Sequence, residues 1–145
     1  MLYFAYGSNM DPIRMARRCP GAVALGCARL PGHRLIFTWD SAFWRGGVGH
    51  VVPSEQDDVW GVLWELGEPD LEALDRYEGI AHGIYRRARI AIEHEGAAVE
   101  ALIYLSNDDR ARRPSRRYVR ALVRGARAHR FPPEYVRLLR RARHR

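Results

Sequence analysis

The chain begins with an apolar run and a glycine turn, which read Leu2-Tyr3-Phe4-Ala5-Tyr6-Gly7-Ser8-Asn9-Met10. An apolar run of this length followed by Gly-Ser-Asn is typical of a β-strand that ends in a turn. Asp11 and Pro12 follow, and they suit the N-cap and the first position of a helix, which we expect from about Asp11 to Cys19. A strand, a tight turn and a helix start together predict a cup of backbone N–H groups suited to carboxylate or carbonyl oxygens.

The size and composition of the chain are those of one globular domain. It has 145 residues, of which 47% are apolar, so it can bury a core of its own. We interpret residues 1–145 as a single domain that includes arginine-rich C-terminal helices over residues 115–143. No apolar window approaches a membrane span and no signal-peptide pattern is present, so we expect no membrane association. Two cysteines cannot form a disulfide framework, which favours a cytoplasmic protein.

The basic residues are unusual in kind and in distribution. All 24 are arginine, and the absence of lysine excludes a P-loop lysine, a Schiff-base lysine and a lysine general base. Residues 110–145 carry a formal charge of +13, whereas residues 1–109 carry −6. The positive charge therefore belongs to the C-terminal helical region and not to the rest of the chain.

The order of the expected elements favours an α+β fold. We predict strands over residues 22–25, 33–39, 50–52, 59–66, 85–93 and 97–105, with Pro31-Gly32 as a turn between the first and second of these. A helix is expected over residues 69–78, and two helices in the last third, the first with an apolar stripe that includes Tyr118. Short strands interrupted by helices, without regular βαβ alternation, favour a small mixed or antiparallel, barrel-like sheet with flanking helices.

The helix over residues 69–78 carries an acidic residue on its apolar face. Leu71 and Leu74 define that face, and Glu78 projects from the same side near the last turn. Burial and the negative end of the helix dipole would both raise the pKa of this carboxyl, as a general base at neutral pH requires. The alternative is that the helix frays at Glu78 and the side chain turns into water.

Other kinds of chemistry find less support in the sequence. Ser8 lacks the Gly-x-Ser-x-Gly elbow of many serine hydrolases, and six histidines show neither the His-x-His nor the His-x-x-x-His spacing of a metal site. We therefore predict no metal centre. Residues 46–49, Gly-Gly-Val-Gly, lack the third glycine and the following helix of a dinucleotide loop.

Taken in order, the motifs resemble those of the gamma-glutamylcyclotransferase-like family. Residues 3–9 resemble its substrate loop, residues 44–48 its Trp-x-Gly-Gly segment, and residues 59–64 its central strand. Leu74-Asp75-Arg76-Tyr77-Glu78-Gly79 is similar to the segment with its catalytic glutamate, and residues 132–135 are similar to its last helix start. The arginine-rich C-terminus and the short loop over residues 40–44 depart from the family pattern.

The resemblance implies a small barrel-like α+β fold and a cofactor-independent enzyme that releases 5-oxoproline from a small gamma-glutamyl amide. The alpha-amine of the substrate would attack its own gamma-carbonyl, so the enzyme needs neither a covalent nucleophile nor a cofactor. Glu78 would be the general acid and base, and the other site residues would bind the substrate: Tyr6, Gly7, Ser8, Asn9, Tyr85 and Tyr104.

Two further interpretations stay open. The chain could be a non-catalytic module, or one that binds nucleic acid or other anions through its arginine-rich helices, although those arginines flank an apolar stripe as on a solvated helix face. Within the enzyme class, the substrate could be an amino acid, a peptide or a biosynthetic intermediate with a masked amine. A monomer and a homodimer are both compatible with the sequence.

Overall fold

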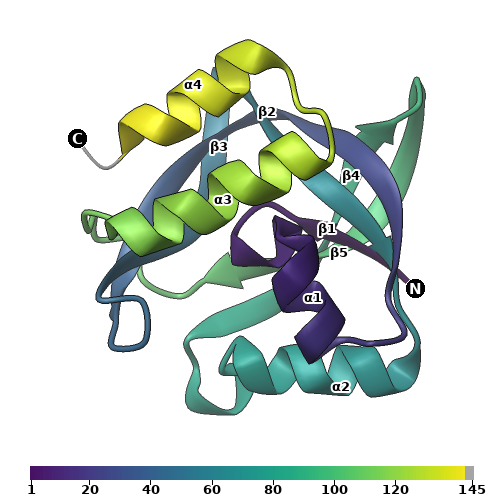
Figure 1. Ribbon diagram of the computed structural model, residues 1–145, viewed down its shortest axis with the longest axis horizontal. Coiled ribbons are helices and arrows are strands. Elements are labelled where there is room, and N and C mark those ends of the chain that lie inside the picture. The colour runs from purple at the N-terminus through teal and green to yellow at the C-terminus, as the bar shows by residue number, and fades with distance from the viewer. Residues whose placement is uncertain (143–145) are drawn as a thin grey trace.

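The computed structural model describes residues 1–142 as a five-stranded closed barrel with helices around it (Figure 1). The strand order around the barrel is β1-β3-β2-β4-β5, with β1 parallel to β5 and all other neighbours antiparallel. This confirms the predicted mixed, barrel-like sheet. The elements are β1 (Leu2–Ala5), η1 (Ser8–Met10), α1 (Pro12–Arg18), β2 (Val23–Ser41), β3 (Gly46–Glu65), α2 (Glu68–Tyr77), η2 (Ile80–His82), β4 (Tyr85–His94), β5 (Ala97–Ser106), α3 (Arg116–Ala128) and α4 (Pro133–Arg141).

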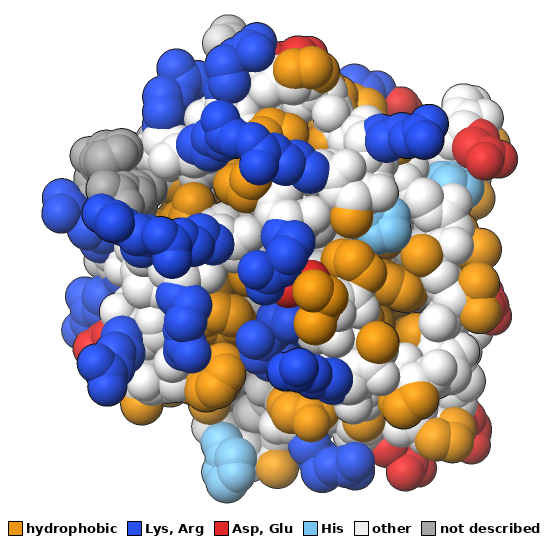
Figure 2. All heavy atoms as spheres, in the orientation of Figure 1, with side chains coloured by type: hydrophobic (Ala, Val, Ile, Leu, Met, Phe, Trp, Pro, Cys, Tyr) orange, Lys and Arg blue, Asp and Glu red, His pale blue; other side chains and the backbone are white. Residues whose placement is uncertain are grey.

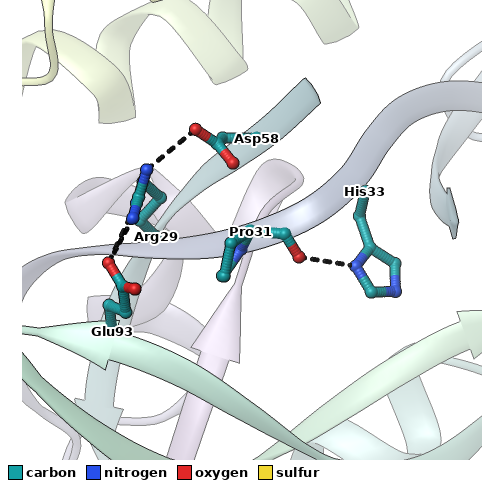
Figure 3. A network of polar contacts seen from close by, with 5 residues as sticks. All are labelled: Arg29, Pro31, His33, Asp58 and Glu93. Atoms are coloured by element: carbon teal, nitrogen blue, oxygen red, sulfur yellow. Dashed lines mark hydrogen bonds and ion pairs between the residues drawn. The ribbon is translucent and has the colours of Figure 1, made fainter. Parts of the chain in front are cut away.

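The strands β2 and β3 form one long hairpin, which the sequence analysis had divided into shorter strands. The predicted turn at Pro31-Gly32 is wrong, because the strand continues through it with a register shift between Pro31 and His33. Gly32 has φ +71°, so the backbone bends at a bulge instead of reversing. His33 Nδ1 lies 3.0 Å from the Pro31 carbonyl oxygen at this bend (Figure 3). The predicted strands over residues 50–52 and 59–66 likewise belong to the single strand β3, although Leu66 lies just beyond its end.

The barrel closes where β2 meets β4, and one arginine connects three strands there. Arg29 on β2 is in register with Glu93 on β4, and its guanidinium bonds both Glu93 and Asp58 on β3 (Figure 3). Its Nη1 lies 2.9 Å from Asp58 Oδ2. The three side chains are partly exposed and solvent screens them, so this network aligns the strands more than it stabilises the fold.

The hairpin β4–β5 agrees with the predicted strands to within one residue at their ends. Its turn is Glu95-Gly96, and both residues have positive φ, +51° and +80°. A two-residue turn with this geometry matches the right-handed twist of the strands it joins.

The helices α3 and α4 pack together across one face of the barrel, while α1 and α2 lie near one of its ends (Figure 1). The predicted apolar stripe of α3 is buried, as are Tyr135 and Leu139 of α4. The helical region that we predicted to residue 143 is described as far as Ala142, and its last predicted residue lies outside the described part of the chain. Within residues 1–142, no helix is both long and apolar enough to cross a membrane.

Two contacts fix the N-terminal turn against α3. Asp11 is fully buried, accepts a hydrogen bond from the Ile13 N–H as the N-cap of α1, and accepts another from Arg124 Nε at 3.0 Å. Gly125 lies against Met10 so closely that a Cβ at this position would stand 2.6 Å from Met10 carbonyl carbon and 2.7 Å from its oxygen. Contacts from α3 therefore hold the turn that follows β1 in place.

Candidate active site

A cavity of about 550 Å³ opens beside the N-terminal turn, within the usual range for a small-molecule site. Segments far apart in the sequence build it: β1 and the turn after it, α1, the β2–β3 turn, the end of α2 and parts of β4, β5 and α3. Every site residue predicted from the sequence lines this cavity, namely Tyr6, Gly7, Ser8, Asn9, Glu78, Tyr85 and Tyr104.

Glu78 lies at the C-terminal end of α2 and faces the cavity. Its backbone N–H donates to the Leu74 carbonyl at 2.8 Å, so the helical turn is intact up to this residue. Gly79 follows with φ +66°, a left-handed conformation that ends the helix. Glu78 Oε1 accepts a hydrogen bond from Asn9 Nδ2 at 3.0 Å. The side chain thus lies in the cavity and not in open solvent, which was the alternative left open by the sequence.

The surroundings of Glu78 bring its pKa close to neutrality. The pKa of this carboxyl is raised from 4.5 to about 7, and burial is the largest cause. The Asp75 charge also raises this pKa, whereas the Arg18 charge and the Asn9 hydrogen bond lower it. Both protonation states are therefore populated at neutral pH. This is the condition under which a carboxyl group can accept a proton and return it efficiently.

Asn9 connects Glu78 to the N-terminal turn through its side chain. Its Nδ2 donates to both Glu78 Oε1 and the Tyr3 hydroxyl, each at 3.0 Å, and its Oδ1 accepts from Arg18 Nη1 at 2.7 Å. Because a guanidinium can only donate, Oδ1 must face Arg18 and Nδ2 must face the carboxylate. The sequence predicts a role for the backbone of Asn9 alone, whereas the structure gives its side chain a fixed place beside Glu78.

The turn itself is a short 3₁₀ helix. The N–H groups of Met10 and Asp11 donate to the Gly7 and Ser8 carbonyls at 3.0 and 3.1 Å. The leading N–H groups of such a turn have no acceptor within it. They belong to Gly7, Ser8 and Asn9, the residues that the sequence predicted to form the cup.

The predicted tyrosines line the cavity with their hydroxyls bonded to neighbouring groups. Tyr85 donates to the Gly49 carbonyl at 2.6 Å, Tyr6 donates to the Tyr104 carbonyl, and Tyr104 donates to Asp75 Oδ1 at 2.7 Å. Burial raises the pKa of all three phenols, so they are neutral at physiological pH. Their rings form the wall, the hydroxyls of Tyr6 and Tyr85 fix the backbone behind it, and the hydroxyl of Tyr104 holds the Asp75 carboxylate.

Tyr118 is a site residue that the sequence analysis placed only in the apolar stripe of α3. Its hydroxyl accepts from the Gly49 N–H at 2.8 Å. Burial raises the pKa of this phenol, against the N–H groups of Gly49 and Ser8, which lower it. A Cβ at Gly7 would stand 2.9 Å from the Tyr118 oxygen, so a larger residue at this position would have to displace the Tyr118 hydroxyl. A tyrosine within an otherwise aliphatic stripe was the available signal.

Several further cavity residues were also not predicted as site residues, among them Tyr3, Arg14 and Arg18. Arg18 approaches Asn9 with one guanidinium nitrogen and stacks over the Tyr77 ring at 4.5 Å. Arg14 stacks over Trp44 at 4.4 Å. Among the cavity residues, four arginines and one carboxylate are charged, and the carboxylate is Glu78.

Known proteins are similar to this chain over nearly its whole length. A family model described as the AIG2-like family matches residues 58–139. The gamma-glutamylcyclotransferase of Bos taurus is 34% identical over 143 residues, which cover 95% of this chain and 76% of the bovine protein. The gamma-glutamylcyclotransferase of Homo sapiens is 34% identical over 139 residues, covering 92% and 74% respectively. A solved structure of a gamma-glutamyl cyclotransferase superposes with a TM-score of 0.91 at 33% identity, covering 96% of this chain and 85% of that one.

These similarities and the fold point to one family. The family model spans more than half of the chain, and the bovine and human relatives extend the match to the N-terminal strand and turn. The closed barrel and its helices superpose on a solved member. The chain therefore belongs to the gamma-glutamylcyclotransferase-like family, whose model is described as AIG2-like.

Proposed function

We propose that this protein is a gamma-glutamylcyclotransferase, which cleaves a small gamma-glutamyl amide into 5-oxoproline and a free amine or amino acid. One observation carries the assignment of roles. Among the residues of the described part of the chain that line the cavity, Glu78 is the only carboxylate; its pKa lies near 7, and Asn9 holds it beside the N-terminal turn. The bovine and human relatives carry the name of this activity.

The reaction uses a nucleophile that the substrate itself contains. Glu78 takes a proton from the alpha-ammonium group, and the freed amine attacks the gamma-carbonyl carbon to close a five-membered ring. The bond between that carbon and the amide nitrogen then breaks, while Glu78 returns its proton to the leaving nitrogen. The second proton lost by the attacking nitrogen also passes to the released amine, which leaves as an ammonium ion. The two reacting groups already belong to one molecule, so the enzyme contributes by folding the substrate chain for attack and by moving the protons.

The remaining groups would bind and fold the substrate. Backbone N–H groups of Gly7, Ser8 and Asn9 would hold the alpha-carboxylate or the oxyanion that develops on the gamma-carbonyl. The rings of Tyr6, Tyr85 and Tyr104 would enclose the gamma-glutamyl chain and exclude water. Ser8 would act through its backbone and not as a nucleophile.

The same proposal needs no cofactor, because proton transfer and ring closure are complete with the groups named. The two cysteines are free thiols, which fits a reducing compartment, and we propose a cytoplasmic protein organised as one domain.

The test is the release of 5-oxoproline from a panel of gamma-glutamyl amino acids and gamma-glutamyl amines by wild type and Glu78→Gln. Glutamine keeps the shape but cannot take a proton, so we expect kcat to fall by about 10²- to 10⁴-fold. Glu72→Gln is the matched control, since Glu72 is exposed on the same helix. A Glu78→Gln variant with near wild-type kcat would refute the role of Glu78, and failure of the wild type on every substrate would refute the activity.

A second candidate function concerns a different surface. A groove of about 700 Å³ follows α3 and α4, and it shares no lining residue with the cavity. Its charged lining consists of Arg116, Arg120, Arg124, Arg127 and Arg140. Figure 2 shows basic side chains gathered over this side of the molecule. Such a surface would bind nucleic acid or another polyanion, and salt-dependent retention on DNA at physiological ionic strength is the measurement that supports or removes this candidate.

A further inference from the structure

Two arginines from different helices converge on the same pair of aromatic rings beside the cavity. Arg14 of α1 lies with its guanidinium carbon 4.4 Å from the Trp44 ring centre and 5.3 Å from that of Phe43. Arg117 of α3 lies 4.7 Å from the Phe43 ring centre and 4.9 Å from that of Trp44, and it donates to the Phe43 carbonyl. The two rings meet edge to face in the β2–β3 turn. We call these four residues the arginine–aromatic cluster.

The cluster holds positive charge that the described residues around it do not neutralise. Burial lowers the pKa of Arg14, and the charges of Arg18, Arg117 and Arg124 lower it further, against Asp11. Within residues 1–142, the buried Nε of Arg14 has no hydrogen-bond partner. Cation–π contacts with the two rings hold the guanidinium groups in place and leave available those N–H donors that the Phe43 carbonyl does not engage. Arginines that are stacked, mutually repelling and short of acceptors suit an anionic ligand.

The charge of the proposed substrate shows which part of it would meet the cluster. The gamma-glutamyl group carries one ammonium and one carboxylate, so its net charge is zero. The cavity is lined by four arginines and one glutamate and is therefore positive. Electrostatic complementarity must then come from the other half of the substrate, the amine that is released.

The position of the cluster supports the same assignment. Arg14, Phe43 and Trp44 line the cavity that also contains Glu78 and the N-terminal turn, so a ligand held at the turn extends toward them. Phe43 is 57% exposed, which places this end of the cavity at the surface, where a side chain of the released amino acid can be accommodated.

We propose that Arg14 and Arg117 form an acceptor subsite that selects gamma-glutamyl substrates with an acidic leaving amino acid. This inference rests on the proposed function and names its substrate class. An acceptor with two carboxylates, as in gamma-glutamyl-glutamate, satisfies the subsite better than the isosteric acceptor of gamma-glutamyl-glutamine, which carries only its alpha-carboxylate. A cationic acceptor is disfavoured most, because it adds a charge of the same sign to a positive cavity.

The test compares gamma-glutamyl-glutamate with gamma-glutamyl-glutamine, which differ by one charge and almost no volume. For the wild type we expect kcat/KM to favour the glutamate acceptor by about tenfold or more, the effect of one charge-assisted hydrogen bond, carried mainly by KM. Arg14→Gln and Arg117→Gln each reduce the ratio, and together they bring it close to one. Arg137→Gln, at an exposed position on α4 that lines neither the cavity nor the basic groove, leaves the ratio unchanged.

A purely structural role for the two arginines predicts a different result, since a disturbed β2–β3 turn would slow both substrates equally and preserve the ratio. That outcome, or equal kcat/KM values in the wild type, would overturn the subsite.

Calorimetric binding of both dipeptides to Glu78→Gln separates this inference from the proposed function. Tighter binding of gamma-glutamyl-glutamate by this variant supports the subsite even if the wild type released no 5-oxoproline. Equal binding of the two would contradict the subsite even if the wild type is active.

Discussion

Asn9 uses every polar group of its side chain. Both N–H bonds of Nδ2 and one lone pair of Oδ1 are engaged, with Glu78, Tyr3 and Arg18, and its main-chain carbonyl accepts from Trp64 Nε1 at 3.1 Å. The side chain is buried, so each of these bonds would be costly to leave unmade. Asn9 therefore acts on Glu78 in two ways, by fixing the position of the carboxylate and by lowering its pKa.

The pH dependence of activity should report this contact. In Asn9→Leu the carboxylate loses its hydrogen bond, so we expect the pKa of Glu78 to rise above about 7. The acidic limb of kcat/KM against pH then moves to higher pH, because the base must be deprotonated. Trp64→Phe is the control, since it removes the bond to the Asn9 carbonyl and leaves the amide contact with Glu78. An acidic limb that stays in place in Asn9→Leu contradicts the assignment.

The burial of Glu78 should also cost stability. Its pKa rises from 4.5 to about 7 on folding, so the folded state keeps a proton that the unfolded chain releases between these values. The free energy of unfolding therefore falls as the pH rises through this range, by on the order of 3 kcal/mol at about 1.4 kcal/mol per pKa unit. Glu78→Gln lacks this loss. The difference in the free energy of unfolding between this variant and wild type should therefore not change with pH below pH 4.5, and it should favour the variant most above pH 7.

Denaturant unfolding of both proteins between pH 4 and pH 8 measures this difference. The exposed Glu72→Gln serves as the comparison and should give a difference that does not depend on pH. If the stability difference between Glu78→Gln and wild type also did not depend on pH, the Glu78 carboxyl of the wild type would have the same pKa in the folded and unfolded chains.

The residues that the sequence identified and those that it missed differ in their physical setting. Gly7 and Asn9 lie in the turn after β1 and Glu78 at the end of α2, where a turn or a carboxylate on an apolar face breaks the local pattern. Arg14, Arg18 and Tyr118 lie within helices whose patterns are already explained by packing or solvation. Periodicity tells which face of a helix a residue occupies, but not which distant segment lies opposite to it.

At the scale of elements, the sequence predicted where strands and helices lie better than it predicted which segments join into one continuous strand. The hairpin β4–β5 was predicted almost to the residue, because its turn requires positive φ and contains Glu-Gly. The hairpin β2–β3 was divided into shorter strands, because Pro31-Gly32 has the composition of a turn. Proline and glycine also suit a bulge, and only pairing with β3 decides that the strand bends and continues. Closure into a barrel depends on such bends, which a local pattern does not distinguish from a reversal.

The contact between α3 and the N-terminal turn should be sensitive to one methyl group. In Gly125→Ala the new Cβ would meet Met10 carbonyl carbon at 2.6 Å, where backbone has little freedom to move. Alanine favours a helix by about 1 kcal/mol over glycine, so the variant would be more stable without this contact. Because of the contact with Met10, we expect a net destabilisation of about 1–3 kcal/mol. We also expect a lower kcat, because the turn beside Glu78 is displaced.

Thermal unfolding and 5-oxoproline release measure the two effects. Arg120→Ala, exposed on the same helix, is the control and should change neither strongly. A more stable Gly125→Ala with full activity would show that the turn does not depend on this packing.

On the scale of the whole molecule, charge is distributed unevenly over the surface. The chain carries +7 overall, with the excess in the C-terminal region, and basic side chains cover much of the face that displays α3 and α4 while acidic ones lie mostly at its margin (Figure 2). Arg117 belongs both to this basic region and to the arginine–aromatic cluster. The departure of the C-terminus from the family pattern is thus connected in space with the acceptor side of the cavity.

This distribution predicts a dependence of activity on ionic strength that differs between substrates. A positive field around the cavity raises kcat/KM for gamma-glutamyl-glutamate, and salt weakens it as the Debye length shortens from about 30 Å at 0.01 M to about 10 Å at 0.1 M. We expect kcat/KM for this substrate to fall steeply over that range at constant pH, and kcat/KM for gamma-glutamyl-alaninamide, with its neutral acceptor, to change little. Arg137→Gln on α4 removes one distant charge and should reduce the salt slope slightly, whereas Arg14→Gln should reduce it most. Equal salt slopes for the two substrates would mean that the field does not act on the acceptor.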